Sequence, residues 1–119
     1  RDLIRTRSID TGNFVGTGGV QDSTARTYAA PNPFAPSRDT ATLVFSLEKE
    51  ADVSIAIYDF ASRLVRDLIS AEPFAGGADH RVAWDGTDQD GQAVANGTYF
   101  YRIQLSTGQM AFGKVVVLD

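Results

Sequence analysis

The chain has 119 residues, of which 43% are hydrophobic and 22% charged, a composition typical of one folded domain rather than of a disordered, collagenous or coiled-coil chain. The net charge of −4 disfavours a broad cationic surface, so we expect no nucleic-acid partner. Apolar runs are shorter than a membrane span, so we expect no membrane insertion. The absence of cysteine excludes disulfides and thiolate metal sites.

Residues 1–28 differ in composition from the rest of the chain. Gly, Thr and Ser are interleaved with isolated apolar residues, a pattern typical of a linker or extension. The same segment is also a candidate donor strand, which would add to the sheet edge of another copy. The apolar residues that would carry such assembly are Leu3, Ile4, Ile9, Phe14 and Val15. We therefore expect an N-terminal extension at 1–28 and a folded domain at 29–119.

From Tyr28 onward, apolar residues alternate with polar ones between clusters of turn-forming residues, which predicts short β-strands. Residues 42–47 and 53–58 are the first two clear strands. Their inward faces are Leu43, Phe45 and Leu47 in one, and Val53, Ile55 and Ile57 in the other. In residues 63–69 the apolar spacing is helical, but the turn expected at 59–62 and the lack of other helical segments favour a strand.

The second half of the domain continues the same pattern. Residues 80–84 lead into Trp84, the only Trp, which we expect in the core. Residues 110–118 follow a Thr107–Gly108 turn and should form a hairpin with the preceding strand. The clearest core face is formed by Tyr99, Tyr101, Ile103 and Leu105. About seven short strands predict an all-β fold, an antiparallel β-sandwich.

Several motifs resemble a known family in their order and spacing. They are APNPF at 30–34, VSIAIYD at 53–59, RLV at 63–65, WDGTD at 84–88 and NGTYFYRI at 96–103. Together they resemble the Ig-like β-sandwich of the flagellar hook-cap assembly protein and related C-terminal modules of secreted bacterial proteins, some of which are sorting domains for type IX secretion. The resemblance covers residues 29–119 and implies an Ig-like fold and an extracellular or cell-surface location. It is much less specific for function, because such sandwiches have many roles.

The segment 85–91 contains three carboxylates within six residues, Asp85, Asp88 and Asp90. Oxygen ligands at this spacing are candidates for binding Ca²⁺, the one cofactor that the sequence suggests. The EF-hand pattern fails, because Gly86 and Gly97 stand at two of its ligand positions. Two Asp-Gly turns, with aspartates bonding to local amides, are the favoured interpretation.

Catalytic and sugar-binding groups are sparse. The only histidine is His80, and no carboxylate pair has a spacing that identifies an acid and a base, so we predict no catalytic residues and no enzyme activity. Residues 108–114 approach the phosphate-loop pattern but form a turn followed by a strand. The aromatic residues that would form a carbohydrate platform if exposed are Trp84, Tyr99, Phe100 and Tyr101.

The sequence therefore favours a non-enzymatic, extracellular structural subunit that self-associates through its N-terminal extension into a filament or other surface assembly. Its expected partners are copies of itself or a secretion or cell-surface protein. Two alternatives remain open. In the first, the chain is a C-terminal sorting or attachment module of a larger secreted bacterial protein. In the second, it is a calcium- or carbohydrate-binding accessory module.

Overall fold

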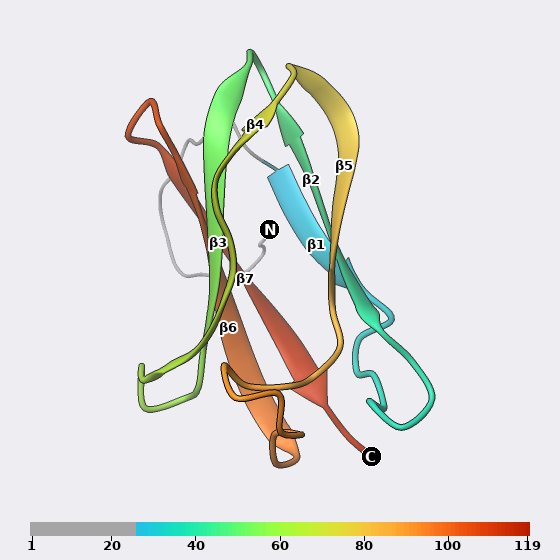
Figure 1. Ribbon diagram of the computed structural model, residues 1–119. Helices are drawn as coiled ribbons and strands as arrows, with labels where there is room; N and C mark the ends of the chain where they lie inside the picture. The colour runs from blue at the N-terminus through green and yellow to red at the C-terminus, as the bar shows by residue number, and fades with distance from the viewer. Residues whose placement is uncertain (1–25) are drawn as a thin grey trace.

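The computed structural model describes residues 26–119, which form two antiparallel sheets packed face to face (Figure 1). One sheet has the order β1-β2-β5, with β1 at Arg26–Ala30, β2 at Ala41–Leu47 and β5 at Gly77–Trp84. The other has the order β4-β3-β6-β7, with β3 at Ala51–Tyr58, β4 at Leu64–Phe74, β6 at Gly97–Leu105 and β7 at Met110–Val117. Seven strands confirm the predicted sandwich, and this part of the chain has no helix, hence none able to cross a membrane.

The core lies between the sheets, where the predicted inward faces of β2, β3 and β6 are buried. Trp84 is fully buried at the end of β5. Its ring makes edge-to-face contacts with Phe34 and Tyr99, with centroid separations of 5.6 Å in both cases, and its Nε1 donates a hydrogen bond to the Thr87 carbonyl. An indole that has both aromatic neighbours and a partner for its N–H can be buried at little polar cost.

β4 is a strand despite its helical apolar spacing, which confirms the prediction for residues 63–69. Its pairing with β3 shifts register at three places along β3. Such irregularities let residues that are not two apart reach the same face. Val65, Leu68 and Ile69 consequently all pack against the core, although their spacing would leave Leu68 and Ile69 on opposite faces of a regular strand.

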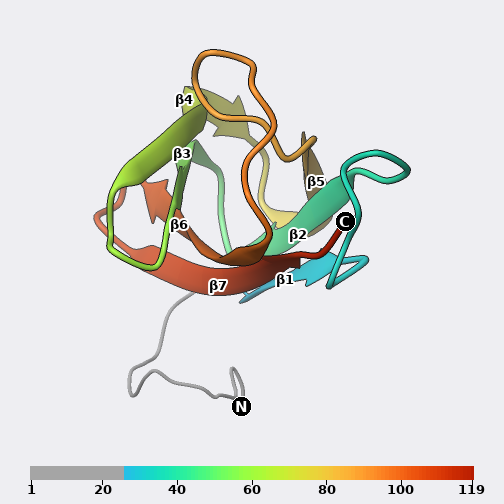
Figure 2. The same ribbon diagram turned by 90° about the horizontal axis from the view of Figure 1, so that it is seen from below.

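The sandwich begins earlier than residue 29, because β1 starts at Arg26 and pairs with β2. Residues 26–28 therefore belong to the sheet rather than to the extension. The early start of the sandwich depends on the pairing of β1 with β2, which the sequence of the five β1 residues does not reveal by itself. After β1 the chain crosses to the other sheet, where Phe34 forms a parallel bridge with Val117. β1 and β7 thus lie side by side at one corner of the sandwich (Figure 2).

The predicted hairpin of the last two strands is confirmed by the antiparallel pairing of β6 with β7. Figure 1 shows this hairpin at the side of the four-stranded sheet, with β7 on its margin. The margin at the opposite side is β4. The sandwich therefore presents a broad outer face on this sheet, and β7 presents a sheet edge.

Candidate protein-interaction surfaces

The outer face of the four-stranded sheet carries several large apolar side chains, at positions where the alternation of strand residues normally places polar ones. Cross-strand pairing places Leu64, Tyr58 and Phe100 in one row that ends at Lys114. The next row contains Phe112, opposite Arg102. We call Leu64, Tyr58, Phe100 and Phe112 the outer-face band. Leu64 is 54% exposed, Phe100 41% and Phe112 61%, so the band is open to solvent.

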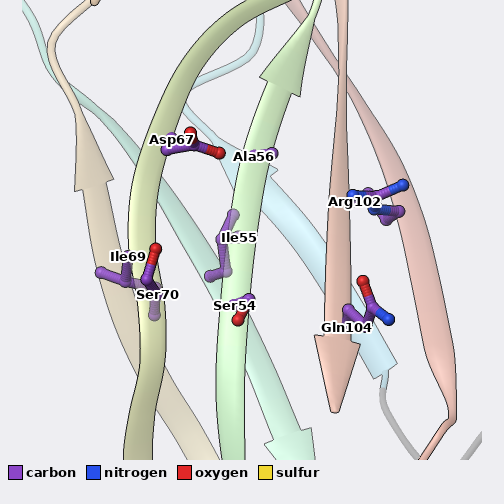
Figure 3. A pocket seen from close by; sticks show the side chains of 8 residues that line it. All are labelled: Ser54, Ile55, Ala56, Asp67, Ile69, Ser70, Arg102 and Gln104. Atoms are coloured by element: carbon purple, nitrogen blue, oxygen red, sulfur yellow. The ribbon is translucent and has the colours of Figure 1, made fainter.

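Charged side chains accompany the band. The guanidinium of Arg102 lies 5.3 Å from the centroid of the Tyr58 ring, close enough for a cation–π contact. Asp67 of β4 is exposed and occupies the same row as Arg102, two strands away. Figure 3 shows the two residues on either side of β3, around a depression of about 50 Å³. That volume suits water rather than a larger ligand.

Along its C-terminal half the edge of β7 is hydrogen-bonded to the segment that follows β1, and β1 itself lies beside β7. The Asn32 side chain accepts from the Val116 N–H and donates to the Lys114 carbonyl, and Phe34 bonds to Val116 and Leu118. Alternate residues of an antiparallel strand direct both backbone groups to the same side, so the N–H and C=O of Phe112 face this edge, away from β6. Within residues 26–119, no strand pairs with this edge between Met110 and Lys114.

The three aspartates of the predicted calcium segment lie in the loop after β5. The Asp85 carboxylate accepts from the N–H and hydroxyl of Thr87, and these bonds, the hydroxyl first, lower the pKa of Asp85. Asp88 accepts from the N–H groups of Asp90 and Gln92. This is the geometry of the favoured turn interpretation. No cluster of three metal-ligating side chains occurs among the described residues, so calcium binding by Asp85, Asp88 and Asp90 stays a prediction.

The other candidate groups are engaged in the fold. A ring nitrogen of His80 shares a hydrogen bond of 2.7 Å with the Ala75 carbonyl, and the ring packs beside Phe45 and Phe74. Residues 108–114 form a turn and the start of β7. Of the possible carbohydrate platform, Trp84, Tyr99 and Tyr101 are buried and only Phe100 is exposed. The four rings cannot form one exposed surface, because neighbouring strand residues face opposite sides.

The outer-face band was not predicted from the sequence. Phe100 and Phe112 were apolar residues at positions that the alternation assigns to solvent, and this is the signal that could have found them. Their adjacency depends on strand register, which local patterns do not contain. The predicted assembly residues Leu3, Ile4, Ile9, Phe14 and Val15 lie outside the described residues.

The fold and its exposed features define an Ig-like β-sandwich domain whose most distinctive surfaces are a sheet face and a sheet edge. The chain matches the family of the FlgD Ig-like domain over residues 33–109, more than half of its length, and belongs to this family. The resemblance to the flagellar hook-cap protein is thereby confirmed. No curated protein matches the chain.

Two solved structures from Porphyromonas gingivalis are similar to the chain. One is PorZ, described as an essential bacterial surface component of the type IX secretion system, with a TM-score of 0.56 and 23% identity over 78% of this chain and 11% of PorZ. The other is dimeric latent PorU, with a TM-score of 0.63 and 26% identity over 85% of this chain and 10% of PorU. The PorZ likeness is one of fold. The chain spans about a tenth of the length of either protein.

Proposed function

We propose that the chain is a non-catalytic sorting or attachment module of a larger secreted or cell-surface bacterial protein, and that it docks onto a protein partner by accepting a strand at the edge of β7. The observation that carries the proposal is the β7 edge between Met110 and Lys114, with which no strand of residues 26–119 pairs. That the chain is a module of a larger protein is supported by its family and by PorZ and PorU, in each of which the similar part is about a tenth of the whole protein.

Strand addition at this edge is physically favourable. An open edge presents N–H and C=O groups in the geometry of a sheet ladder, and proteins usually cover such edges or protect them with charges, proline or bulges. A partner strand would pair with the backbone groups of Phe112 and also contact its exposed ring. Backbone hydrogen bonds provide affinity in this mode, and side-chain pockets provide specificity.

The experiment is delivery of a reporter fused to the chain in a bacterium with type IX secretion, measured as reporter at the cell surface. Phe112→Pro removes an N–H from the edge and obstructs an incoming strand, while the ladder to β6 is kept because this N–H does not face β6. We expect this variant to lose surface delivery. Phe112→Ala, which keeps the N–H, should retain a part of it.

Phe100→Ala is the matched control, because it removes an exposed aromatic ring from the neighbouring strand without touching the edge. Thermal unfolding of each purified variant establishes that it is folded. Normal delivery by a folded Phe112→Pro variant would overturn the proposal, and so would an equal loss with Phe100→Ala.

The same edge, unpaired by any strand of residues 26–119, favours a second candidate, the structural subunit that self-associates through residues 1–25. In this case Leu3, Ile4, Ile9, Phe14 and Val15 would provide the apolar side chains of a strand donated by another copy. Light scattering and negative-stain imaging of the chain with and without residues 1–25 test it. Filaments or large particles that disappear on truncation would support this candidate, and particles no larger than a dimer in both forms would reject it.

A further inference from the structure

We propose that the outer face of the four-stranded sheet pairs with the same face of a second copy of this chain, about a twofold axis parallel to the strands. The surface is the outer-face band, Leu64, Tyr58, Phe100 and Phe112, together with the charges at its margins. This pairing is independent of strand addition at the β7 edge, and it uses a face rather than an edge.

Strand register makes the apolar side chains of the band neighbours. Leu64 pairs with Tyr58, and Tyr58 pairs with Phe100, so three large side chains are adjacent across three strands. Phe112 lies diagonal to Phe100 on β7 and is 61% exposed. The solvent face of an antiparallel sheet is normally polar, and a contiguous apolar patch on such a face marks an interaction surface.

The charges at the two margins of the face match those of a second copy. Asp67 stands at the β4 margin, whereas Lys114 stands at the β7 margin and Arg102 on the strand beside it. The ion pairs of the described residues are Arg63–Asp59 and Arg66–Asp85, so none of them uses Asp67, Arg102 or Lys114. The face therefore has a negative margin and a positive one, each without an opposite charge bound to it.

A twofold axis parallel to the strands brings β4 of one copy over β7 of the other. Asp67 of each copy then lies next to the positive margin of its partner, and the apolar rows meet in the middle. An interface between identical faces must be self-complementary in this way. The N-terminal extension fits the face less well, because its Arg1, Arg5 and Arg7 would meet Arg102 and Lys114.

The experiment is sedimentation equilibrium on the full chain over a range of concentrations. We expect a monomer–dimer equilibrium, with dimerisation weakened at least about tenfold by Phe100→Ser, which removes the central ring. Asp67→Lys and Lys114→Glu should each weaken it to a similar extent, because each places like charges opposite one another. The double variant Asp67→Lys/Lys114→Glu restores complementarity and should recover the original constant within about threefold.

Arg81→Glu is the matched control for Lys114→Glu, since it makes the same charge change at an exposed position of β5 in the other sheet. It should leave the constant unchanged. A monomer at all concentrations, a double variant no better than the single ones, or equal weakening by Arg81→Glu would each overturn the proposal. Surface delivery separates the two hypotheses, because Phe100→Ser leaves the β7 edge intact and should not reduce delivery.

Discussion

At the scale of single residues, Gly113 of β7 packs directly against the ring of Tyr101 of β6. The two residues are cross-strand partners, and the Tyr101 ring occupies the space where a Cβ on residue 113 would stand. The Tyr101 hydroxyl reaches further, to share a hydrogen bond of 2.7 Å with the Thr27 hydroxyl of β1. Glycine at 113 thus lets one buried side chain connect the two sheets.

Gly113→Ala is expected to destabilise the domain by about 3 kcal/mol, because an added methyl group overlaps the buried ring and a packed core has little room to adjust. Chemical denaturation measures the loss. Lys114→Ala, at the neighbouring exposed position, is the control and should change stability by less than about 0.5 kcal/mol. Equal stability of Gly113→Ala and the original chain would contradict the packing described here.

Tyr101 also predicts how stability changes at high pH. Burial raises the pKa of Tyr101 above its ordinary value of 10.0, with the Thr27 hydrogen bond a smaller opposing influence. In the unfolded chain this phenol loses its proton near the ordinary value, so above that pH the unfolded state binds fewer protons than the folded one. The contribution of Tyr101 is therefore complete below about pH 10 and decreases as the pH rises beyond it.

Tyr101→Phe should lower stability at neutral pH by about 1 kcal/mol, because the hydrogen bond to Thr27 is lost, and should make the decline above about pH 10 shallower. Urea denaturation at a series of pH values measures both effects. Tyr28→Phe, with a ring that is 57% exposed, is the control. An unchanged alkaline decline in Tyr101→Phe would show that this phenol does not stay protonated in the folded state.

At the scale of elements, the loop between β5 and β6 has a structural role. Its Gln89 N–H donates to the Val65 carbonyl of β4, and the Gln89 side chain accepts from the Asp67 N–H. The loop thereby satisfies part of the β4 edge, which would otherwise invite pairing with another chain. The aspartate turns hold the loop in the shape that makes these bonds possible.

Asp88→Ala should cost about 1–2 kcal/mol of stability, because the side chain accepts from two backbone N–H groups of its turn. Asp90→Ala is the control, since Asp90 contributes only its N–H to that turn. Thermal unfolding of the two variants makes the comparison. Equal effects of the two substitutions would contradict the turn interpretation.

The effect of calcium on the melting temperature is a separate test of the same loop. A site with a Kd of about 10⁻⁴ M would stabilise the domain by about 2.7 kcal/mol at a hundredfold excess over Kd. The favoured turn interpretation predicts no rise in melting temperature on adding calcium, because oxygens of Asp85 and Asp88 already accept backbone and hydroxyl hydrogens. A rise that Asp90→Ala abolishes would instead establish a calcium site.

At the scale of the whole molecule, the sandwich closes its core with residues from all seven strands and from the segment around Phe34. Among the described residues, the largest buried side chains, which include Trp84, Tyr101 and Phe34, lie in residues 34–117. Phe34 is inserted beside Val117, so the two ends of the domain are joined. From this arrangement we expect the folded unit not to depend on the segment that precedes it.

Deletion of residues 1–25 is therefore expected to leave the melting temperature within a few degrees of that of the full chain, a change of less than about 1 kcal/mol. Differential scanning calorimetry measures it. Deletion of residues 1–34, which also removes β1 and Phe34, should prevent folding and is the positive control. A large loss of stability on removing 1–25 alone would assign those residues a part in the core.

The alternation of Leu43, Phe45 and Leu47, and of Tyr99, Tyr101 and Ile103, was sufficient to predict the strands and their buried faces. The physical reason is that successive strand residues face opposite sides, so a core on one side selects apolar residues at every second position. The all-β class, the final hairpin and the buried Trp84 could be predicted in the same way, because each depends on residues close together in the sequence.

Only the tertiary structure decided where β1 begins, how β4 brings Leu68 and Ile69 to the core, and which side chains meet on the outer face. Each of these depends on pairing between segments far apart in the chain, and a shift of one residue in that pairing would turn every side chain to the other side. In the sequence, Phe100 and Phe112 stand in two separate segments, with nothing that shows them to be neighbours. Register made them neighbours, and with them it created the surface on which we expect a second copy to bind.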